Sequence, residues 1–216
     1  MSFYPELDDL SLKELIDRFS EPPLDGPEYA TAYYQETALS IAQQGTDGAA
    51  YLLSVLEDSN LDTDRLRSAL MALTQLPPEH SPTEPRTLRQ LLSQYLSDQK
   101  PLITAEAVDG LWRQNIKDAR DAVLRLRTHP SPYVRGSVLR YMSHLYPGEA
   151  VPLLVDALHD DGSIVRENAV DELDWLGAAE ALSALRPLTG DPDPHVRQAA
   201  ETAVANLSVR QEGAIA

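Results

Sequence analysis

The apolar positions in the second half of the chain repeat with a fixed period. Three similar segments contain Arg135, Arg166 and Arg197, and the two intervals between these arginines are equal. We call this interval the period. Apolar residues stand one position before each arginine and again three and seven positions after it. Spacings of four and eight positions place these side chains on one face of a helix. The pattern therefore predicts a helix that recurs once in every period.

The same pattern continues toward the N-terminus with less regularity. Thr104 stands one period before Arg135, and the apolar residues Ile103, Ala107 and Leu111 keep their places around it. A fifth copy is predicted around Arg67. Further apolar spacing and cap residues predict helices over three ranges of the N-terminal third, 10–19, 27–44 and 46–57.

A second helix is predicted after each recurring one, over Gly148–Leu158 and Gly177–Leu188. Both ranges carry apolar side chains at helical spacing, and Leu154 and Leu185 are again one period apart. The recurring helices have start signals of their own. Caps are predicted at Ser131 and Asp193, each followed by a proline at the first helical position.

Helix pairs this short cannot bury their apolar faces alone, so neighbouring pairs must stack into one continuous core. We therefore predict an all-α fold, a right-handed α-solenoid of about five to six helix pairs. A single repeat domain is expected over residues 1–216. Its predicted parts are irregular repeats and a cap (1–75), a Pro-rich loop (76–87), regular repeats (88–207) and a flexible tail (208–216).

The turn from Asp191 to Arg197, with its copies at Asp160–Ala169 and His129–Val138, resembles HEAT repeats of the bacterial phycobilisome-lyase-like class. The resemblance is strong over 101–207 and weak before. It implies an internal ladder in which the arginine after the valine and an aspartate near the turn support the stack. The residues that match these positions are Arg135, Arg166, Arg197, Asp160 and Asp191. His129 and Thr104 depart from the pattern, so the ladder is expected to be interrupted there.

Composition narrows the choice of partner. The net charge is −16, from 34 acidic and 18 basic side chains, which disfavours nucleic acid because a polyanion would be repelled. The absence of cysteine excludes disulfides, thiolate metal ligands and cysteine nucleophiles. The start of the chain has no signal-peptide pattern and no apolar run is long enough to span a membrane, so we expect a cytoplasmic protein.

The charges are unevenly distributed. Residues 110–140, called the basic segment below, hold seven basic and two acidic residues, whereas residues 1–64 hold 14 acidic and two basic ones. The candidate partner-binding residues are Trp112, Arg113, Lys117, Arg120, Arg125 and Arg127. An acidic partner would fit the basic segment and a basic partner the N-terminal region, and the same asymmetry would allow a weak homodimer. The alternative is a solvated helix surface on a monomer.

The sequence offers no catalytic constellation, no cofactor motif and no metal-ligand set. The five histidines form no pair at metal-binding spacing, and no His-Glu dipeptide of the kind found in HEAT-like hydroxylases occurs. HEAT-like DNA glycosylases are disfavoured by the overall charge. Glu167, Asp171 and Asp174 fall on one outward stripe, interpreted as solubilising or as a contact for a basic protein.

We therefore predict a non-catalytic scaffold or adaptor that binds another protein. The resemblance implies one alternative, a phycobilin lyase or lyase-like chaperone for light-harvesting proteins. A third possibility is a regulatory or immunity-type inhibitor that blocks a basic protein through the acidic N-terminal region.

Overall fold

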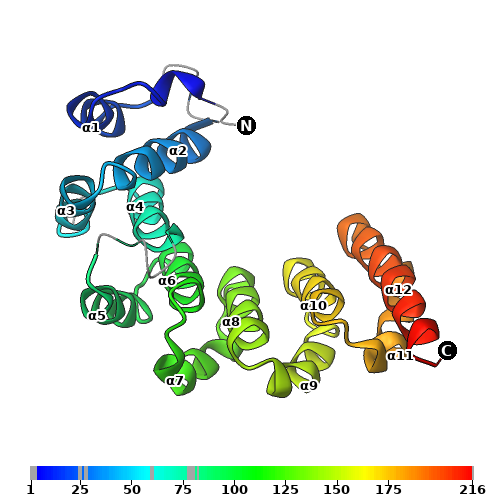
Figure 1. Ribbon diagram of the computed structural model, residues 1–216. Helices are drawn as coiled ribbons and strands as arrows, with labels where there is room; N and C mark the ends of the chain where they lie inside the picture. The colour runs from blue at the N-terminus through cyan, green and yellow to red at the C-terminus, as the bar shows by residue number, and fades with distance from the viewer. Residues whose placement is uncertain are drawn as a thin grey trace. The chain divides into compact units, whose positions relative to one another are not determined.

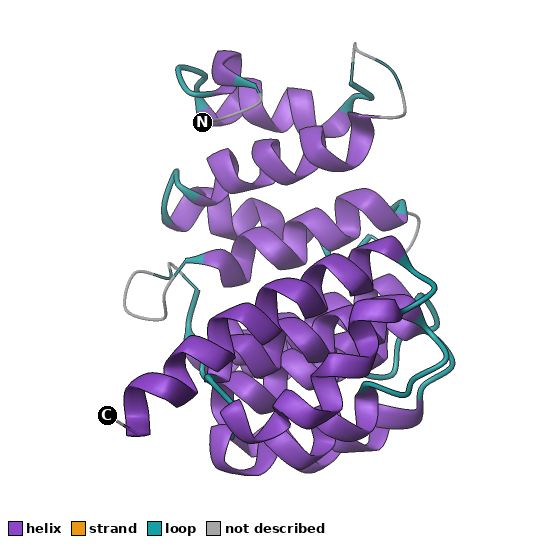
Figure 2. Ribbon diagram, turned by 90° about the vertical axis from the view of Figure 1, so that its right-hand side faces the viewer, coloured by secondary structure: helices purple, strands orange, loops and turns teal. Residues whose placement is uncertain are grey.

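The computed structural model describes residues 4–23, 26, 29–58, 61–76, 81 and 83–215, with the backbone alone given for 211–215. These residues form helices and loops and contain no strand (Figure 2), which confirms the predicted all-α class. The chain divides into two compact units, Met1–Ile116 and Lys117–Ala216. The single domain expected from the repeat period stays a prediction.

The first unit opens with a short 3-10 helix, η1 (Pro5–Leu7), followed by α1 (Leu12–Ser20). The Ser11 hydroxyl accepts a hydrogen bond from the Glu14 backbone N–H, and the Glu14 carboxylate accepts one from the Ser11 N–H at 2.9 Å. This reciprocal capping box fixes the start of α1 at Ser11, inside the range 10–19 predicted as a helix.

Three helices of the first unit lie side by side in chain order, α2 (Ala30–Ala42), α4 (Thr63–Gln75) and α6 (Pro101–Arg113). On one side of them lie α3 (Thr46–Val55), packed against α2 and α4, and α5 (Pro85–Tyr95), packed against α6 (Figure 1). Helix α5 begins inside the loop predicted over 76–87, because Pro85 occupies its first position, where a missing N–H costs nothing.

The second unit repeats this arrangement. Helices α8 (Pro132–Leu145), α10 (Ser163–Leu176) and α12 (Pro194–Ile215) lie side by side, with α10 in the middle. Helix α9 (Pro147–Ala157) packs against both α8 and α10 (Figure 1). The shorter elements are η4 (Lys117–Ala119), α7 (Arg120–Leu124), η5 (Arg125–Thr128), η6 (Ala179–Ala181), α11 (Leu182–Leu185) and η7 (Arg186–Gly190).

The recurring apolar positions form the core of the second unit. The valines before the three arginines are buried, as are the residues three positions after each arginine: Val134, Val165, Val196, Val138, Ala169 and Ala200. Each helix turns the same face toward the covering elements because its apolar side chains recur with the helical period. The opposite face of α8, α10 and α12 carries polar side chains together with the exposed aromatic residues Tyr133 and Trp175.

Two local predictions are corrected by the structure. Gly177–Leu188 is not one helix: Gly177 ends α10 in the left-handed conformation (φ 69°), and two 3-10 helices flank the single turn of α11. Pro187 lacks the N–H that a continuous helix needs there. The predicted cap Ser131 makes no side-chain cap bond. Helix α12 extends to Ile215, into the segment 208–216, for which a flexible tail stays a prediction.

Candidate functional site

Two ion pairs join successive repeats of the second unit. Arg135 donates to both carboxylate oxygens of Asp160, at 2.8 and 2.6 Å, and Arg166 donates to both of Asp191, at 2.8 Å each. Each pair links residues 25 positions apart, so each arginine reaches the turn before the next recurring helix. Bidentate pairs of this kind combine charge attraction with fixed geometry.

Each of the three arginines also binds its own turn. The Nη1 groups of Arg135, Arg166 and Arg197 donate to the backbone carbonyls six and five residues earlier, at distances between 2.6 and 3.2 Å. Arg197 makes these carbonyl contacts in the last repeat, where its charge acts on Asp191, but within the described residues it shows no hydrogen bond or ion pair to a carboxylate. These contacts stiffen the turns that space α8, α10 and α12.

His129 and Thr104, the two residues that depart from the repeat pattern, still make some of the hydrogen bonds within their own turns. His129 Nδ1 accepts from the Ser131 N–H at 3.0 Å, as Asp160 accepts from Gly162 at 2.8 Å. In the first unit, the Thr104 hydroxyl donates to the carbonyl of Asp98, six residues earlier, at 3.2 Å. Neither supplies an ion pair, so at these positions only the bonds within one turn are kept.

The exposed side of α8, α10 and α12 lies opposite the buried repeat positions, and we call it the free face. Its side chains on α8 are Tyr133, Arg140 and His144, those on α10 are Glu167, Asp171, Asp174 and Trp175, and Asn206 lies on α12. Half of Tyr133 and 57% of Trp175 are exposed, which is unusual for large aromatic side chains in a folded protein. The free face is therefore the candidate binding surface.

The exposed indole of Trp175 is held in place by a histidine from the neighbouring helix. The rings of Trp175 and His144 lie 4.3 Å apart between centroids, inclined by 44°. His144 Nε2 lies 3.8 Å from a carboxylate oxygen of the buried Glu172, which also accepts a hydrogen bond from Ser143. The His144 ring therefore packs against one side of the indole, and the rest of the Trp175 side chain faces solvent.

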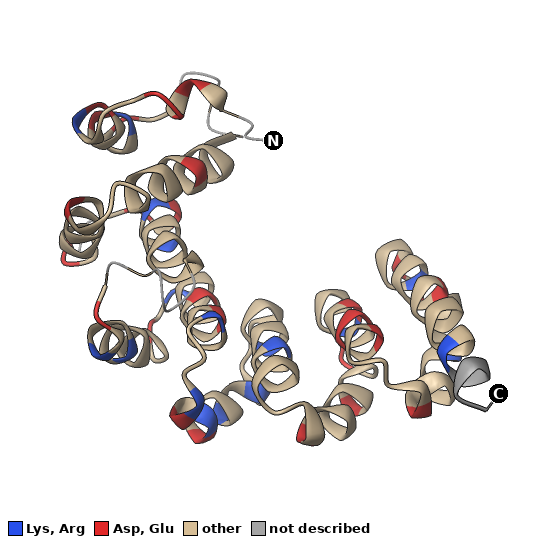
Figure 3. Cartoon of the chain, viewed as in Figure 1, with Lys and Arg blue, Asp and Glu red and all other residues tan. Residues whose placement is uncertain are grey.

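Helix α10 carries several acidic residues (Figure 3), and in sequence Asp171 and Asp174 stand four and one positions before Trp175. Although the Asp171 side chain is exposed, partial desolvation by the surrounding protein, together with repulsion from Glu167 and Glu172, raises the pKa of Asp171 to about 6. Asp174 accepts a hydrogen bond from Asn206 of α12 at 2.7 Å. The free face thus concentrates negative charge around an aromatic ring.

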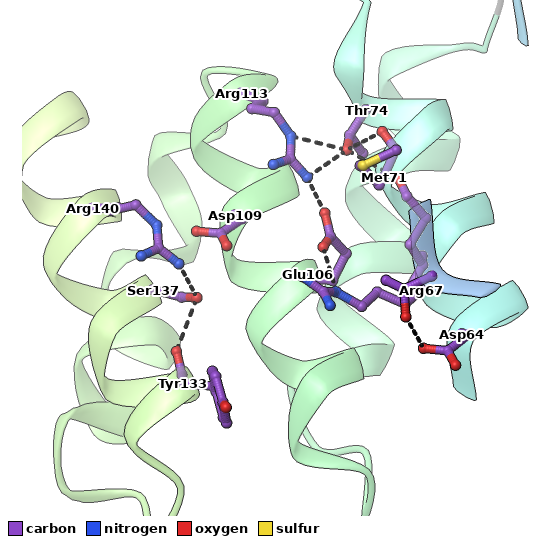
Figure 4. A network of polar contacts seen from close by, with 12 residues as sticks. Asp64, Arg67, Met71, Thr74, Glu106, Asp109, Arg113, Tyr133, Ser137 and Arg140 are labelled. Carbon is purple, nitrogen blue, oxygen red and sulfur yellow. Dashed lines mark hydrogen bonds and ion pairs between the residues drawn. The ribbon is translucent and has the colours of Figure 1, made fainter. Parts of the chain in front are cut away.

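The α8 part of the free face is fixed by a chain of polar contacts (Figure 4). Arg140 donates to the Ser137 hydroxyl at 2.8 Å and to Asn168 of α10 at 2.6 Å, and Ser137 donates to the Tyr133 carbonyl at 3.2 Å. These bonds use hydrogen-bonding groups of Arg140 internally. They also fix the spacing of α8 and α10, which carry Tyr133 and Trp175.

The first unit has a polar cluster of its own (Figure 4). Glu106 of α6 is buried and pairs with Arg67 of α4, at 3.2 Å, and with Arg113. Arg113 also donates to the Thr74 hydroxyl at 3.1 Å. A buried carboxylate needs such compensation, so the cluster is sufficiently explained by the packing of α4 against α6.

The predicted candidate residues of the basic segment are spread over both units. Trp112 and Arg113 belong to α6, where Trp112 is partly buried and its N–H approaches Asp109 at 3.3 Å. In the second unit Arg120 pairs with Glu149. Lys117, Arg125 and Arg127 are exposed, and the last two border a surface hollow of about 260 Å³ with Asp121, Leu124 and Thr128. A partner-binding role for this segment stays a prediction.

Sequence reasoning missed Trp175, although the period contains a signal for it. His144, Trp175 and Asn206 follow one another at the interval of the period, as do Arg140, Asp171 and Thr202. The residues of each set occupy matching places on α8, α10 and α12. Counting the period through polar positions, and not only through apolar ones, would have predicted these rows on the exposed side.

Metal sites and membrane-spanning helices are both absent from the described part of the chain. No group of three or more histidine, aspartate or glutamate side chains there is arranged to hold a metal ion. No helix within the same residues is long and apolar enough to cross a membrane.

Stacked helix pairs joined by an Arg–Asp ladder define a class, the α-helical repeat proteins. A family model of HEAT repeats matches residues 86–173 and 123–205, which together cover more than half of the chain. The chain belongs to the HEAT-repeat family.

Solved structures with the same fold are distant in sequence. Two engineered proteins match with a TM-score of 0.51: one is 16% identical, with 92% of this chain and 96% of that one covered. The other is 18% identical, with 91% and 57% covered. The complex of CpcE and CpcF of phycocyanin lyase from Nostoc sp. matches with a TM-score of 0.46 at 14% identity, covering 92% and 95%. No curated protein matches the chain significantly by sequence.

Proposed function

We propose that this protein is a non-catalytic binding module whose free face receives another protein. The observation that carries the proposal is the 57% exposed indole of Trp175, held against His144 on a helix that the ladder keeps in place. Tryptophan is the residue most enriched among those that dominate binding energy at protein interfaces. An exposed ring on a rigid element binds with little loss of conformational freedom.

The surroundings of Trp175 support recognition more than catalysis. The carboxylates beside it lie on an open surface, and Asp174 is engaged by Asn206. Acid–base catalysis would require a second group within hydrogen-bond reach of a bound substrate in a cleft that excludes water. A surface of aromatic and charged side chains suits a protein partner.

Affinity capture from a lysate of the source organism tests the proposal, with the wild-type chain and a Trp175→Ala variant as bait. Tyr29→Ala is the matched control, because Tyr29 is 52% exposed in the first unit. We expect a partner that wild type and the Tyr29 variant retain and the Trp175 variant loses. Retention by all three would overturn the free face as the binding surface.

The same capture experiment, with variants of the basic segment as bait, tests the candidate residues of that segment. Arg125→Glu and Arg127→Glu reverse two exposed charges without breaking a hydrogen bond that the structure records. A partner lost only from these variants would assign binding to the basic segment. Turnover of a small molecule with no partner retained would contradict a binding module.

Each of the two alternative functions predicted from the sequence would be supported by the capture of a different kind of protein. A coloured bilin protein, with a spectral change when bilin is added, would favour a lyase-like chaperone. A basic protein released by variants of the acidic region 1–64 would favour an inhibitor. Release of that protein by salt would not distinguish the two surfaces, because both are exposed and screened alike.

A further inference from the structure

The free face combines an exposed aromatic ring with carboxylates placed to receive a cation beside it. Asp171 and Trp175 are separated by one turn of α10, which brings their Cβ atoms within about 6 Å of each other. Asp174 precedes Trp175 directly and carries a second negative charge. A planar cation could lie over the indole and still reach the Asp171 carboxylate.

We propose that Trp175 and Asp171 bind an arginine side chain from an exposed segment of the partner protein. This inference rests on the function proposed above and names the chemistry of its partner. The guanidinium group is planar, stacks on aromatic rings and pairs with carboxylates through two hydrogen bonds. A lysine ammonium can supply the charge, but it cannot match both the stacking and the paired bonds.

Charge complementarity selects this occupant over an acidic or apolar one. Asp171 is exposed on α10, Glu167 and Asp174 are partly exposed beside it, and Arg140 of α8 already donates to Ser137 and Asn168. Arg210 of α12 lies against the end of α10, where its Nη1 approaches the Asp174 carbonyl at 3.5 Å, so three carboxylates still outnumber the two cations beside them. His144 faces the same region, and it contacts Trp175 and lies near Glu172. The surface is therefore negative where a ligand would lie. An acidic segment would be repelled there, and an apolar one would leave the carboxylates without partners.

The energetic cost of the cluster also supports a binding role. Like charges at i, i+4 on one helix repel, and the pKa of Asp171, raised to about 6, reflects this repulsion together with partial desolvation. A cation placed beside Asp171 would remove the repulsion. Asp174 is held by Asn206 of α12, whereas Asp171 has no such structural partner in the described residues and gains one when a cation binds.

A peptide of alternating glycine and arginine, acetylated and amidated, tests the proposal in comparison with its lysine and citrulline analogues. Trp112→Phe is introduced in every variant so that Trp175 is the only fluorophore of its type, since the chain has two tryptophans. We expect the arginine peptide to change Trp175 fluorescence on binding. The lysine peptide should bind about five-fold more weakly, and the neutral citrulline peptide should not bind.

Fluorescence anisotropy of a labelled peptide measures the dissociation constant for the variants that lack Trp175. Trp175→Ala and Asp171→Asn should each weaken arginine-peptide binding about five- to ten-fold. Glu180→Gln removes one charge from an exposed position on η6 and should leave binding within two-fold, roughly the effect of one distant screened charge. Equal weakening by Asp171→Asn and Glu180→Gln, with no effect of the charge-neutral Trp175→Ala, would mean attraction by net charge alone and would overturn the proposal.

Loss of folding cannot imitate the expected result. Trp175 is exposed and Asp171→Asn removes a repulsion, so both variants should keep the wild-type circular dichroism and thermal midpoint or exceed it. If Trp175→Ala loses the captured partner but the arginine, lysine and citrulline peptides bind equally, the binding module stands and the arginine assignment fails. If sedimentation shows a dimer that Arg125→Glu abolishes, the occupant is a second copy of this chain and not a partner.

Discussion

Arg166 holds Asp191 through two hydrogen bonds of equal length, from Nε to Oδ2 and from Nη2 to Oδ1, each 2.8 Å. The two residues come from successive repeats, and both side chains are largely buried, at 13% and 7% exposure. The pair therefore connects the start of α10 to the turn before α12. Its loss leaves a carboxylate without its cation.

We expect Arg166→Ala to lower the free energy of unfolding by about 2–4 kcal/mol, because removing one partner of a buried pair exposes the desolvation cost of the other. Arg197→Ala is the matched control, since Arg197 makes the same two turn contacts without a recorded carboxylate partner. It should cost about 1–2 kcal/mol. Urea denaturation followed by circular dichroism measures both. Equal losses would show that the inter-repeat pair adds nothing.

Acid should weaken the ladder in a defined direction. The hydrogen bonds from Arg166 lower the pKa of Asp191 below its ordinary value of 3.8. A carboxylate with a lowered folded-state pKa stabilises the fold above about pH 4, and this stabilisation is lost as the pH falls through the folded pKa. Asp191→Asn should therefore be less stable than wild type at about pH 7, with the two converging toward about pH 3. Parallel stability curves would contradict this assignment.

Asp171 should show the opposite sign. Its pKa is raised to about 6, so the folded state binds the proton more tightly than the unfolded state does. Ionisation therefore costs stability as the pH rises from about 4 to about 6, and the cost persists above that range. Asp171→Asn should raise the thermal midpoint at about pH 7 and have little effect near pH 4. After allowance for solvent screening, the gain should stay below about 1 kcal/mol.

Alanine substitutions at two glycines should change the stability of the fold in opposite directions. A Cβ at Gly48, at the start of α3, would lie 1.8 Å from the carbonyl oxygen of Ile41, whereas a Cβ at Gly148 would meet no atom within 4 Å. Gly48→Ala must shift backbone and should cost more than about 2 kcal/mol. Gly148→Ala lies within α9 and should stabilise by up to about 1 kcal/mol. Thermal melts of both variants provide the check.

The repeat period was enough to predict the fold class. Because a residue such as Val134 or Val165 recurs at the same helical position, its burial follows from local periodicity and from the need to cover an apolar face. The reciprocal cap at Ser11 is similarly local, since it depends on residues three apart. Interactions within about one turn of helix can be inferred from sequence without coordinates.

The apolar pattern over Gly177–Leu188 did not reveal that the predicted helix is interrupted there. Its apolar spacing is helical, yet Gly177 takes the left-handed conformation and Pro187 lacks a donor. Apolar periodicity reports which side chains are buried, and a chain of short 3-10 and α turns can bury Leu182, Leu185 and Leu188 equally well.

The sequence by itself determined that this protein is a stack of helices with a polar side and an apolar side. Only the tertiary structure decided which polar residues stand together: His144 beneath Trp175, Asn206 beside Asp174, and Arg166 with Asp191. Burial follows a strong and short-ranged hydrophobic preference, which the pattern records directly. Contacts between exposed side chains depend instead on how neighbouring helices are spaced and on which partner each group reaches.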